Sequence, residues 1–143
     1  MNMTVTGQNQ GAFTTGKAIQ VLDISHEIIS PRDPASGQAT GRQQHKAISV
    51  TMLWGPTTPK FLTALVTNEN LTSVLIGLLQ TSSRAAPTQV ATIKLTNASV
   101  SHFVQNGQTV QFDMTYQKIT WTWVDGGITA QDEWQHTETT PKP

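Results

Sequence analysis

The chain has 143 residues, enough for one domain with a sizeable core, and nine basic against nine acidic side chains give a formal net charge of zero. These charges are scattered singly, so no basic stripe is available for phosphates and we expect no nucleic-acid partner. The absence of cysteine excludes disulfides, thiolate chemistry and cysteine-based metal sites. Only 13% of residues are charged, whereas Thr, Gln, Ser and Asn are abundant, and this composition favours strands over helices.

No targeting segment is recognisable. Residues 1–7 have neither the basic nor the apolar region of a cleaved signal peptide. The longest apolar run, Val74–Leu79, is far too short to cross a membrane. We therefore expect a soluble chain made in the cytoplasm, with no membrane insertion.

The first third predicts two strands and a long loop. Met1–Val5 predicts a short strand, and Ala18–Ile29 predicts a second strand with Ile19 and Val21 on one face. Its other face carries mainly Leu22, Ile24 and Ile28. Ser30–Gly41 holds two prolines and two glycines without apolar periodicity, which indicates a loop that is long for a compact domain.

A strand and the one clear helix follow. Ala47–Leu53 predicts a strand, after which Thr57 or Thr58 can cap a helix that has Pro59 near its first position. The residues at helical spacing are Phe61, Leu62, Leu65 and Val66. This helix ends around Thr67–Asn68 and is too short to cover much sheet, so we expect it to plug one side or one end of a barrel.

Leu71–Gln80 is apolar on both faces, which predicts a strand buried on both sides. The helix could cover one side, and a neighbouring subunit could cover more.

The next two strands form a predicted hairpin. Gln89–Gln105 changes parity, because Ala91, Ile93 and Leu95 are odd-numbered whereas Ala98, Val100 and Val104 are even. A three-residue loop, Gln105–Gly107, with Gly107 left-handed in a bulge, aligns Val104, Val100 and Ala98 with Val110, Phe112 and Met114. The opposite face of the hairpin is then small, polar and nearly uncharged, and it carries Ser99, Ser101, Gln111, Asp113 and Thr115.

The stretch Val110–Trp134 completes the barrel. Its alternating apolar set changes parity, from Val110, Phe112, Met114 and Tyr116 to Ile119, Trp121 and Trp123, which predicts a bulge or bend near Tyr116–Lys118. Asp125–Gly127 supplies a turn, and Ile128–Trp134 returns as a final strand. The predicted fold is mainly β: a small closed barrel of two antiparallel sheets with one short α-helix, spanning residues 1–134 and followed by a loose tail at 135–143.

The chain shows no catalytic pattern. His26, His45, His102 and His136 lack metal-ligand spacing, and we interpret His102 as a strand-face residue and His45 and His136 as surface residues. No nucleophile elbow, phosphate loop or dinucleotide motif is present. Asp132 and Glu133 are adjacent in a predicted strand and so point to opposite faces. We expect no enzyme activity, no cofactor and no metal.

Three segments resemble one family, the Hcp (haemolysin-coregulated protein) tube proteins of type VI secretion. Ser25–Pro34 and Ser36–Lys46 resemble their second strand and extended loop, and Thr58–Glu69 resembles their short helix. Ile93–Val100 and Tyr116–Trp134 resemble their paired C-terminal strands. Two departures stand out: the segment between Gly11 and Ile19 is short for the family, and the hairpin between Ala98 and Met114 closes tightly.

The resemblance implies a structural protein. Members form hexameric rings that stack into the hollow inner tube of a contractile injection machine, with a spike at its tip and a sheath around it, and the expelled tube can carry small effectors. The protein would assemble in the cytoplasm and then be secreted without a cleaved signal peptide, and we expect no toxic domain after Trp134. The loop between stacked rings would comprise Ser30, Pro31, Arg32, Asp33, Pro34, Ser36, Gly37, Gln38, Thr40 and Gly41. The lumen-facing candidates are Ser99, Ser101, Gln111, Asp113 and Thr115; the candidates for barrel and subunit packing are Val74, Ile76, Leu78, Trp121, Trp123 and Trp134.

Two other classes of function remain open on the residues alone. Trp121, Trp123 and Trp134 could bind glycans or peptides in a monomeric module, although alternation with Thr favours packing. A secreted enzyme is the third possibility, and the chain offers no constellation for it. The size of the particle in solution separates a ring from a single barrel.

Overall fold

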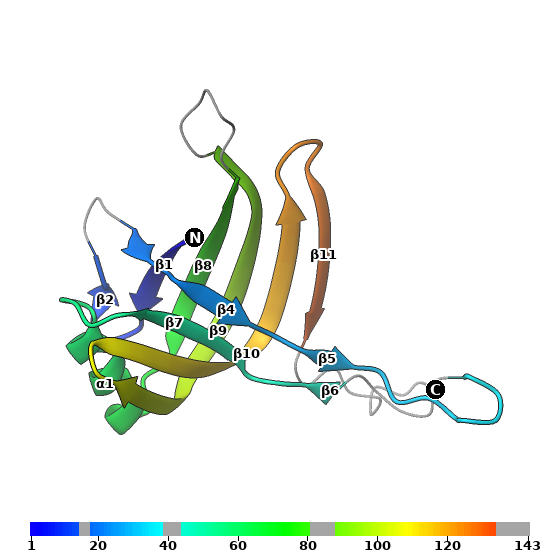
Figure 1. The fold of residues 1–143 in the computed structure, drawn as a ribbon, viewed down its shortest axis with the longest axis horizontal. Helices are drawn as coiled ribbons and strands as arrows, with labels where there is room; N and C mark the ends of the chain where they lie inside the picture. Colours follow the sequence, from blue (N-terminus) through cyan, green and yellow to red (C-terminus); the bar gives the residue numbers. More distant parts are fainter. Residues whose placement is uncertain (15–17, 39–43, 81–87, 134–143) are drawn as a thin grey trace.

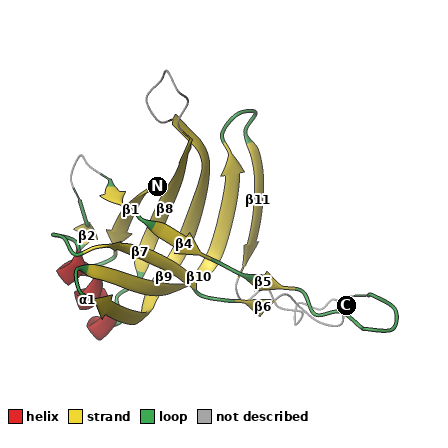
Figure 2. Cartoon of the chain, in the orientation of Figure 1, coloured by secondary structure: helices red, strands yellow, loops and turns green. Residues whose placement is uncertain are grey.

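The computed structural model describes residues 1–14, 18–38, 44–80 and 88–133. The part described is mainly β, with one helix and two antiparallel sheets, as predicted (Figures 1 and 2). One sheet is large and curls around the core, whereas the other is a two-stranded ribbon that leads away from the body. In the part described, no helix has the length and apolar character needed to cross a membrane.

The large sheet has nine strands, and several neighbours in it are far apart in the chain. Its order is β2-β1-β8-β9-β10-β7-β4, with β3 on β1 and β11 on β10. The strands are β1 (Asn2–Gly7), β2 (Gly11–Ala12), β3 (Ile19–Gln20), β4 (Asp23–Ser25), β7 (Ile48–Leu53), β8 (Leu71–Gln80), β9 (Thr88–Asn106), β10 (Thr109–Trp123) and β11 (Ile128–Glu133). The ribbon consists of β5 (Ile28–Ile29) and β6 (Gln44–His45).

The segment Ile19–Ser25 closes the barrel by changing partners. Its first part, β3, pairs with β1, and its last part, β4, pairs with β7 at the other end of the path. Between them the Val21 amide donates to the Met1 carbonyl at 2.9 Å, and the Leu22 amide donates to the Thr51 carbonyl at 2.8 Å. The single strand predicted over Ala18–Ile29 is therefore wrong, because this segment must serve two neighbours that diverge around the barrel.

Three neighbouring strands bend at one level. The buried set changes parity between Leu71 and Val74 in β8, between Leu95 and Ala98 in β9, and at Gln117 in β10. Asn97, at the centre of this line, has a left-handed backbone with φ of 53°. The pairing register of β9 and β10 is the same on both sides of Asn97, so no residue is inserted there. The predicted bend near Tyr116–Lys118 is confirmed, and it arises because both strands change face together.

The hairpin between β9 and β10 turns more tightly than predicted. Thr109 pairs directly with Asn106, so the loop is Gly107-Gln108, and Gly107 has the expected positive φ of 62°. The register shift lies further down, at Ser101, between the pairs Asp113–His102 and Met114–Val100. As a consequence Phe103 pairs with Phe112 and packs against the core, whereas Val104, predicted for that inner face, pairs with Gln111 on the other face. The register that places Phe103 on the inner face is favoured because a pair of aromatic rings buries more apolar surface than a ring and a valine do.

The helix plugs one end of the barrel. In α1 (Thr58–Thr67), Phe61 is fully buried and its ring stacks on Phe112 with centroids 4.6 Å apart. Thr57 is the N-cap residue, but its side chain makes no capping hydrogen bond. The inner face includes Ala64, whereas Val66, predicted for that face, is 75% exposed. The helical spacing of the apolar residues alone did not show whether Ala64 or Val66 faces the core.

Candidate functional site: an arm, a polar face and two apolar surfaces

The first candidate feature is the arm, residues 26–46, of which 39–43 fall outside the description. Its ribbon, β5 and β6, runs away from the barrel body and ends in a loop that stands clear of it (Figure 1). The arm contains most of the predicted loop; Thr40 and Gly41 lie outside the described residues.

The arm tip satisfies its own hydrogen bonds. The Asp33 amide donates to the Gln38 carbonyl, and the Gly37 amide donates to the Asp33 carbonyl, both at 2.7 Å. The Asp33 carboxylate accepts from Ser36 Oγ at 2.8 Å and from the Ala35 amide at 3.3 Å. These two bonds, the Ser36 bond foremost, lower the pKa of the Asp33 carboxyl. The tip is therefore a preformed turn presented to solvent.

At the arm root, four side chains form a continuous hydrogen-bonded chain. Tyr116 Oη lies 2.7 Å from His26 Nε2 and 2.7 Å from His45 Nδ1, and His45 Nε2 lies 2.9 Å from Asp132 Oδ2. His45 is buried, contrary to the predicted surface position, because the root folds it against β10 and β11. Nothing in the spacing of these four residues along the chain signals that they meet.

The second feature, the polar face, is the outer side of four neighbouring strands. Directly paired residues share a face, and on this side β4, β7, β10 and β9 present short polar side chains. Its members are Asp23, Ser25, Ser49, Thr51, Gln111, Asp113, Thr115, Ser99 and His102, with Ser101 at the bulge and one apolar residue, Val104, paired with Gln111. It therefore gathers the five residues predicted for the lumen and adds residues of β4 and β7 that sequence reasoning missed.

The central acid of the polar face is tied to its neighbours. Asp113 Oδ1 accepts from Ser49 Oγ at 2.7 Å and from Gln111 Nε2 at 3.2 Å. Its other oxygen, Oδ2, lies 3.4 Å from His102 Nδ1, and His102 lies on the strand face as predicted. Both oxygens of the Asp113 carboxylate therefore have a neighbouring polar side chain on this face.

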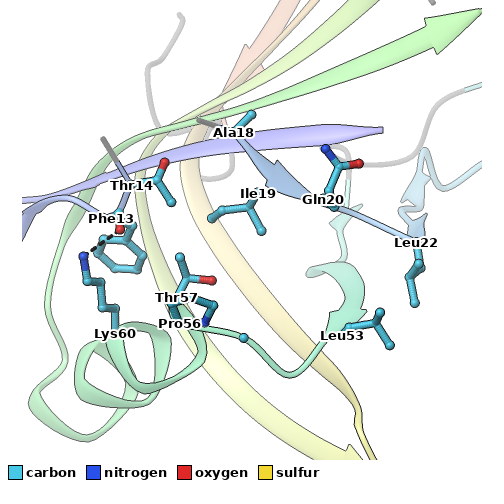
Figure 3. A pocket seen from close by; sticks show the side chains of 11 residues that line it. Phe13, Thr14, Ala18, Ile19, Gln20, Leu22, Leu53, Pro56, Thr57 and Lys60 are labelled. Carbon is cyan, nitrogen blue, oxygen red and sulfur yellow. Dashed lines mark hydrogen bonds between the residues drawn. The ribbon is translucent and has the colours of Figure 1, made fainter. Parts of the chain in front are cut away.

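The third feature is an apolar groove of about 520 Å³ beside the helix (Figure 3). Its walls come from the segment around Ile19, from the end of β7 and from the start of α1. Leu22 and Leu53, at one side of it, are 53% and 58% exposed. Lys60 Nζ, at the opposite side, donates to the Phe13 carbonyl at 2.6 Å.

The fourth feature, the apolar ledge, is where the inner face of the sheet extends past the barrel. Leu78, Trp121 and Trp123 line a hollow of about 330 Å³ together with Ile128 and Ala130 of the edge strand β11. Trp123 is 48% and Ile128 67% exposed. Of the predicted packing residues, Val74 and Ile76 lie fully buried in the core, Leu78 and Trp121 pack at its margin, and Trp134 is outside the described residues.

A buried carboxylate fixes the turn between β1 and β2. Glu69, 3% exposed, accepts from the amides of Asn9 and Gln10 at 2.8 Å and from Gln10 Nε2 at 2.9 Å. Burial alone would raise the pKa of Glu69, but the bonds from Gln10 and Asn9 outweigh it and leave the pKa lowered. Gly7 packs against Oε2 so closely that a Cβ there would collide with it. This site anchors the fold and is closed to ligands.

Comparison with known proteins shows what the chain is related to. Residues 3–123 match the family described as "Type VI secretion system effector, Hcp". The chain is 31% identical, over 161 aligned residues, to the "Major exported protein" of Pseudomonas aeruginosa, with 93% of this chain and 94% of the relative covered. The chain belongs to the Hcp family.

Solved structures agree with this assignment. A crystal structure of an Hcp protein superposes with a TM-score of 0.85 at 24% identity, covering 93% of this chain and 98% of the other. The secreted protein Hcp3 from Pseudomonas aeruginosa has a TM-score of 0.80 at 27% identity, with 93% and 98% covered. The barrel, the helix and the arm thus form an Hcp fold.

The Hcp assignment gives the described features a context. The arm tip lies in the segment that resembles the extended loop of the Hcp proteins. Among the described residues, no group of three His, Cys, Asp or Glu side chains is placed to hold a metal ion.

Proposed function

We propose that this Hcp-family chain is the structural subunit of the type VI secretion inner tube. Copies form hexameric rings, the rings stack into a hollow tube, and the tube is expelled with the spike from within the sheath while small effectors travel in its lumen. The role is that of a building block and not of an enzyme. The name of the Pseudomonas relative, an exported protein, supports export of this chain as well.

The observation that carries the proposal is apolar surface left uncovered on two separate parts of one barrel. The groove lies beside α1 and β3, whereas the ledge lies on β8–β11, beyond the body. A closed ring needs two different patches on each subunit, one for each neighbour. Leu22 on the groove and Ile128 on the ledge are more than half exposed, and contact with further copies would remove both from water.

Single lysine substitutions test ring formation. Leu22→Lys or Ile128→Lys places a charge on an apolar contact, and we expect each to convert rings to single barrels at concentrations where the unaltered chain is hexameric. Val66→Lys is the matched control, since Val66 is 75% exposed on the helix and a cation near a helix C-terminus is tolerated. The measurement is light scattering after size-exclusion chromatography, with electron micrographs for annular particles. An unaltered chain that stays a single folded copy at high concentration removes the proposal.

The polar face supports the lumen assignment. Most of its side chains are short, and its central acid, Asp113, is held by Ser49 and Gln111. Such a surface would let cargo slide without trapping it by charge. The chain has no cysteine, so one introduced thiol reports on one position.

Thiol labelling tests the lumen assignment. In assembled tubes, Thr115→Cys or Ser99→Cys should react much more slowly with a bulky maleimide than with a small reagent, because the bulky one must diffuse along the bore. Val66→Cys, on the helix, should show no such size dependence. Equal rates for both reagents at Thr115 and Ser99 would place the polar face outside the tube.

The exposed tryptophans give less support to a monomeric binding module. Trp121 packs against the core, and Trp123 lies on the ledge among aliphatic side chains with little polar surface. Sugar sites need polar groups beside the aromatic ring, so the ledge resembles a protein contact more than a glycan site.

A further inference from the structure

The four side chains at the arm root come from four separate segments. His26 precedes β5, His45 lies in β6, Tyr116 in β10 and Asp132 in β11. The first two belong to the arm and the last two to the barrel body, so their hydrogen bonds join one part to the other. Tyr116 is 3% exposed and the His45 side chain only 1%, so these bonds are shielded from water.

Matching donors to acceptors orders the protons along this chain. The Asp132 carboxylate only accepts, so a neutral His45 carries its proton on Nε2 and leaves Nδ1 as an acceptor. Tyr116 O–H then donates to His45 Nδ1, and the phenol oxygen accepts from His26 Nε2–H. In these three hydrogen bonds, each residue donates to the next: His26 of the arm to Tyr116 of the body, Tyr116 to His45 of the arm, and His45 to Asp132 of β11.

One added proton can be accommodated by reversing part of the chain. A protonated His45 donates from both nitrogens, to Asp132 and to the Tyr116 oxygen. Tyr116 O–H can then donate to His26 Nε2, provided that His26 holds its proton on Nδ1. The three distances need not change.

A second added proton breaks the pattern. Two imidazolium rings would both aim N–H donors at the Tyr116 oxygen, with each ring nitrogen 2.7 Å from it. Two positive charges that share one neutral partner repel, and burial strengthens the repulsion. The other ionisable groups on these elements are exposed or half-exposed and are not hydrogen-bonded to the rings in the described contacts: Glu27, Lys46, Lys118 and Glu133.

We propose that this hydrogen-bonded chain positions the arm for its contact with the next ring, and that protonation of both histidines releases the arm. The inference rests on the proposed stacking role of the arm. His26, His45, Tyr116 and Asp132 are positioning residues, since they join the arm to the barrel body and act on the next ring only through the arm tip.

The electrostatics favour a firm hold at neutral pH. Burial, and next the nearby His45, lower the pKa of His26 from its ordinary value of 6.5. Burial, and next the charge of Asp132, raise the pKa of Tyr116, so its hydroxyl keeps the proton that the chain needs. A depressed histidine pKa means that the stabilisation is present above pH 6.5 and is lost as the pH falls through the value in the folded protein.

Hydrogen exchange of the arm tests the positioning. The reporters are the amides of the β5–β6 ladder and of Lys46, which donates to the Glu27 carbonyl at 3.0 Å. Tyr116→Phe removes only the hydroxyl, and we expect these amides to exchange at least about tenfold faster at neutral pH. In the unaltered chain the same loss, corrected for intrinsic rates, should appear only on acidification below pH 6.5. In Tyr116→Phe the corrected protection should be low and flat across that range.

Two comparisons keep the test specific. His102→Gln removes an exposed histidine from the polar face and should leave exchange in the arm and its pH profile unchanged. His26→Gln affects one hydrogen bond of the chain, whereas Tyr116→Phe removes two. It should therefore raise exchange at neutral pH less than Tyr116→Phe does. Ring nitrogen NMR should find the proton of neutral His45 on Nε2 in the unaltered chain, because Asp132 accepts from that nitrogen.

Assembly separates this inference from the proposed function. Tyr116→Phe should still form rings by light scattering, but its rings should stack into tubes less readily at neutral pH. Failure of the unaltered chain to form rings would count against the proposed function and leave the exchange test intact. Identical arm exchange in Tyr116→Phe and the unaltered chain at every pH overturns the inference, and so does a neutral His45 protonated on Nδ1.

Discussion

In the barrel body the rings of Phe13, Phe61 and Phe112 pack in a row, with centroids 5.0 and 4.6 Å apart, and all three are almost fully buried. In the arm, two-residue strands carry an exposed loop, and at the root a hydrogen-bonded chain links His26 and His45 to the body. Apolar burial depends little on pH, whereas the arm's polar contacts depend on which groups hold protons. The stability that the apolar core gives the barrel body should therefore depend little on pH, whereas the position of the arm should depend on it.

The largest effect on the stability of the barrel body is expected when the ring at the centre of its core is removed. Phe112→Ala removes the ring that both Phe61 and Phe103 contact, and we expect the free energy of unfolding to fall by about 3–5 kcal/mol. Urea unfolding followed by tryptophan fluorescence measures it. Val104→Ala, which shortens a less buried side chain in the same hairpin, should cost far less; equal losses would mean that the core is not centred on Phe112.

An intermediate effect is expected at the polar anchor of the body. Glu69→Gln replaces the carboxylate that accepts from Asn9 and Gln10, and it should cost about 1–3 kcal/mol. Because the pKa of Glu69 is lowered, its stabilisation is present above the unfolded value of 4.5 and is lost as the pH falls through the folded value. The gap between the two proteins should therefore narrow on acidification in urea titrations at several pH values. Glu133→Gln, at an exposed site, is the control and should show neither effect.

The smallest effect on stability should come from the arm tip. Asp33→Ala removes the acceptor for Ser36 and Ala35, yet the described hydrogen bonds of residues 33–38 all lie within the tip, so the urea midpoint should not move measurably. Ring stacking should still weaken, because the turn loses its fixed shape. Ser36→Ala removes one of the same bonds and should weaken stacking less. If Asp33→Ala lowers the midpoint as much as Glu69→Gln does, the arm is coupled to the core more tightly than its contacts indicate.

Sequence periodicity predicted the barrel well, and its failures have physical causes. The parity change around Tyr116–Lys118 was readable because large apolar residues flank it, and the structure places the bend there. The hairpin bulge was misplaced because a period-two pattern does not distinguish Phe103 from Val104 until the partner, Phe112, is fixed.

The candidate site was predictable only where its residues lie close together in sequence. The polar faces of β9 and β10 follow from one hairpin, so their residues were found, whereas Ser49 joins them only through the pairing of β7 with β10. His45 was taken for a surface residue because its partners, Tyr116 and Asp132, lie 71 and 87 positions away. Contacts at such separations depend on how the barrel closes, and no local pattern records them.

The closing segment has a mechanical consequence. Ser25, the last residue of β4, leads directly into the arm, so a tension applied to the tip is transmitted to a joint of three paired residues between β4 and β7. The seam that completes the barrel wall thus lies directly behind the hydrogen-bonded root of the arm. A pull on the arm would open the wall at β4 first, while the long pairing of β9 with β10 remained intact.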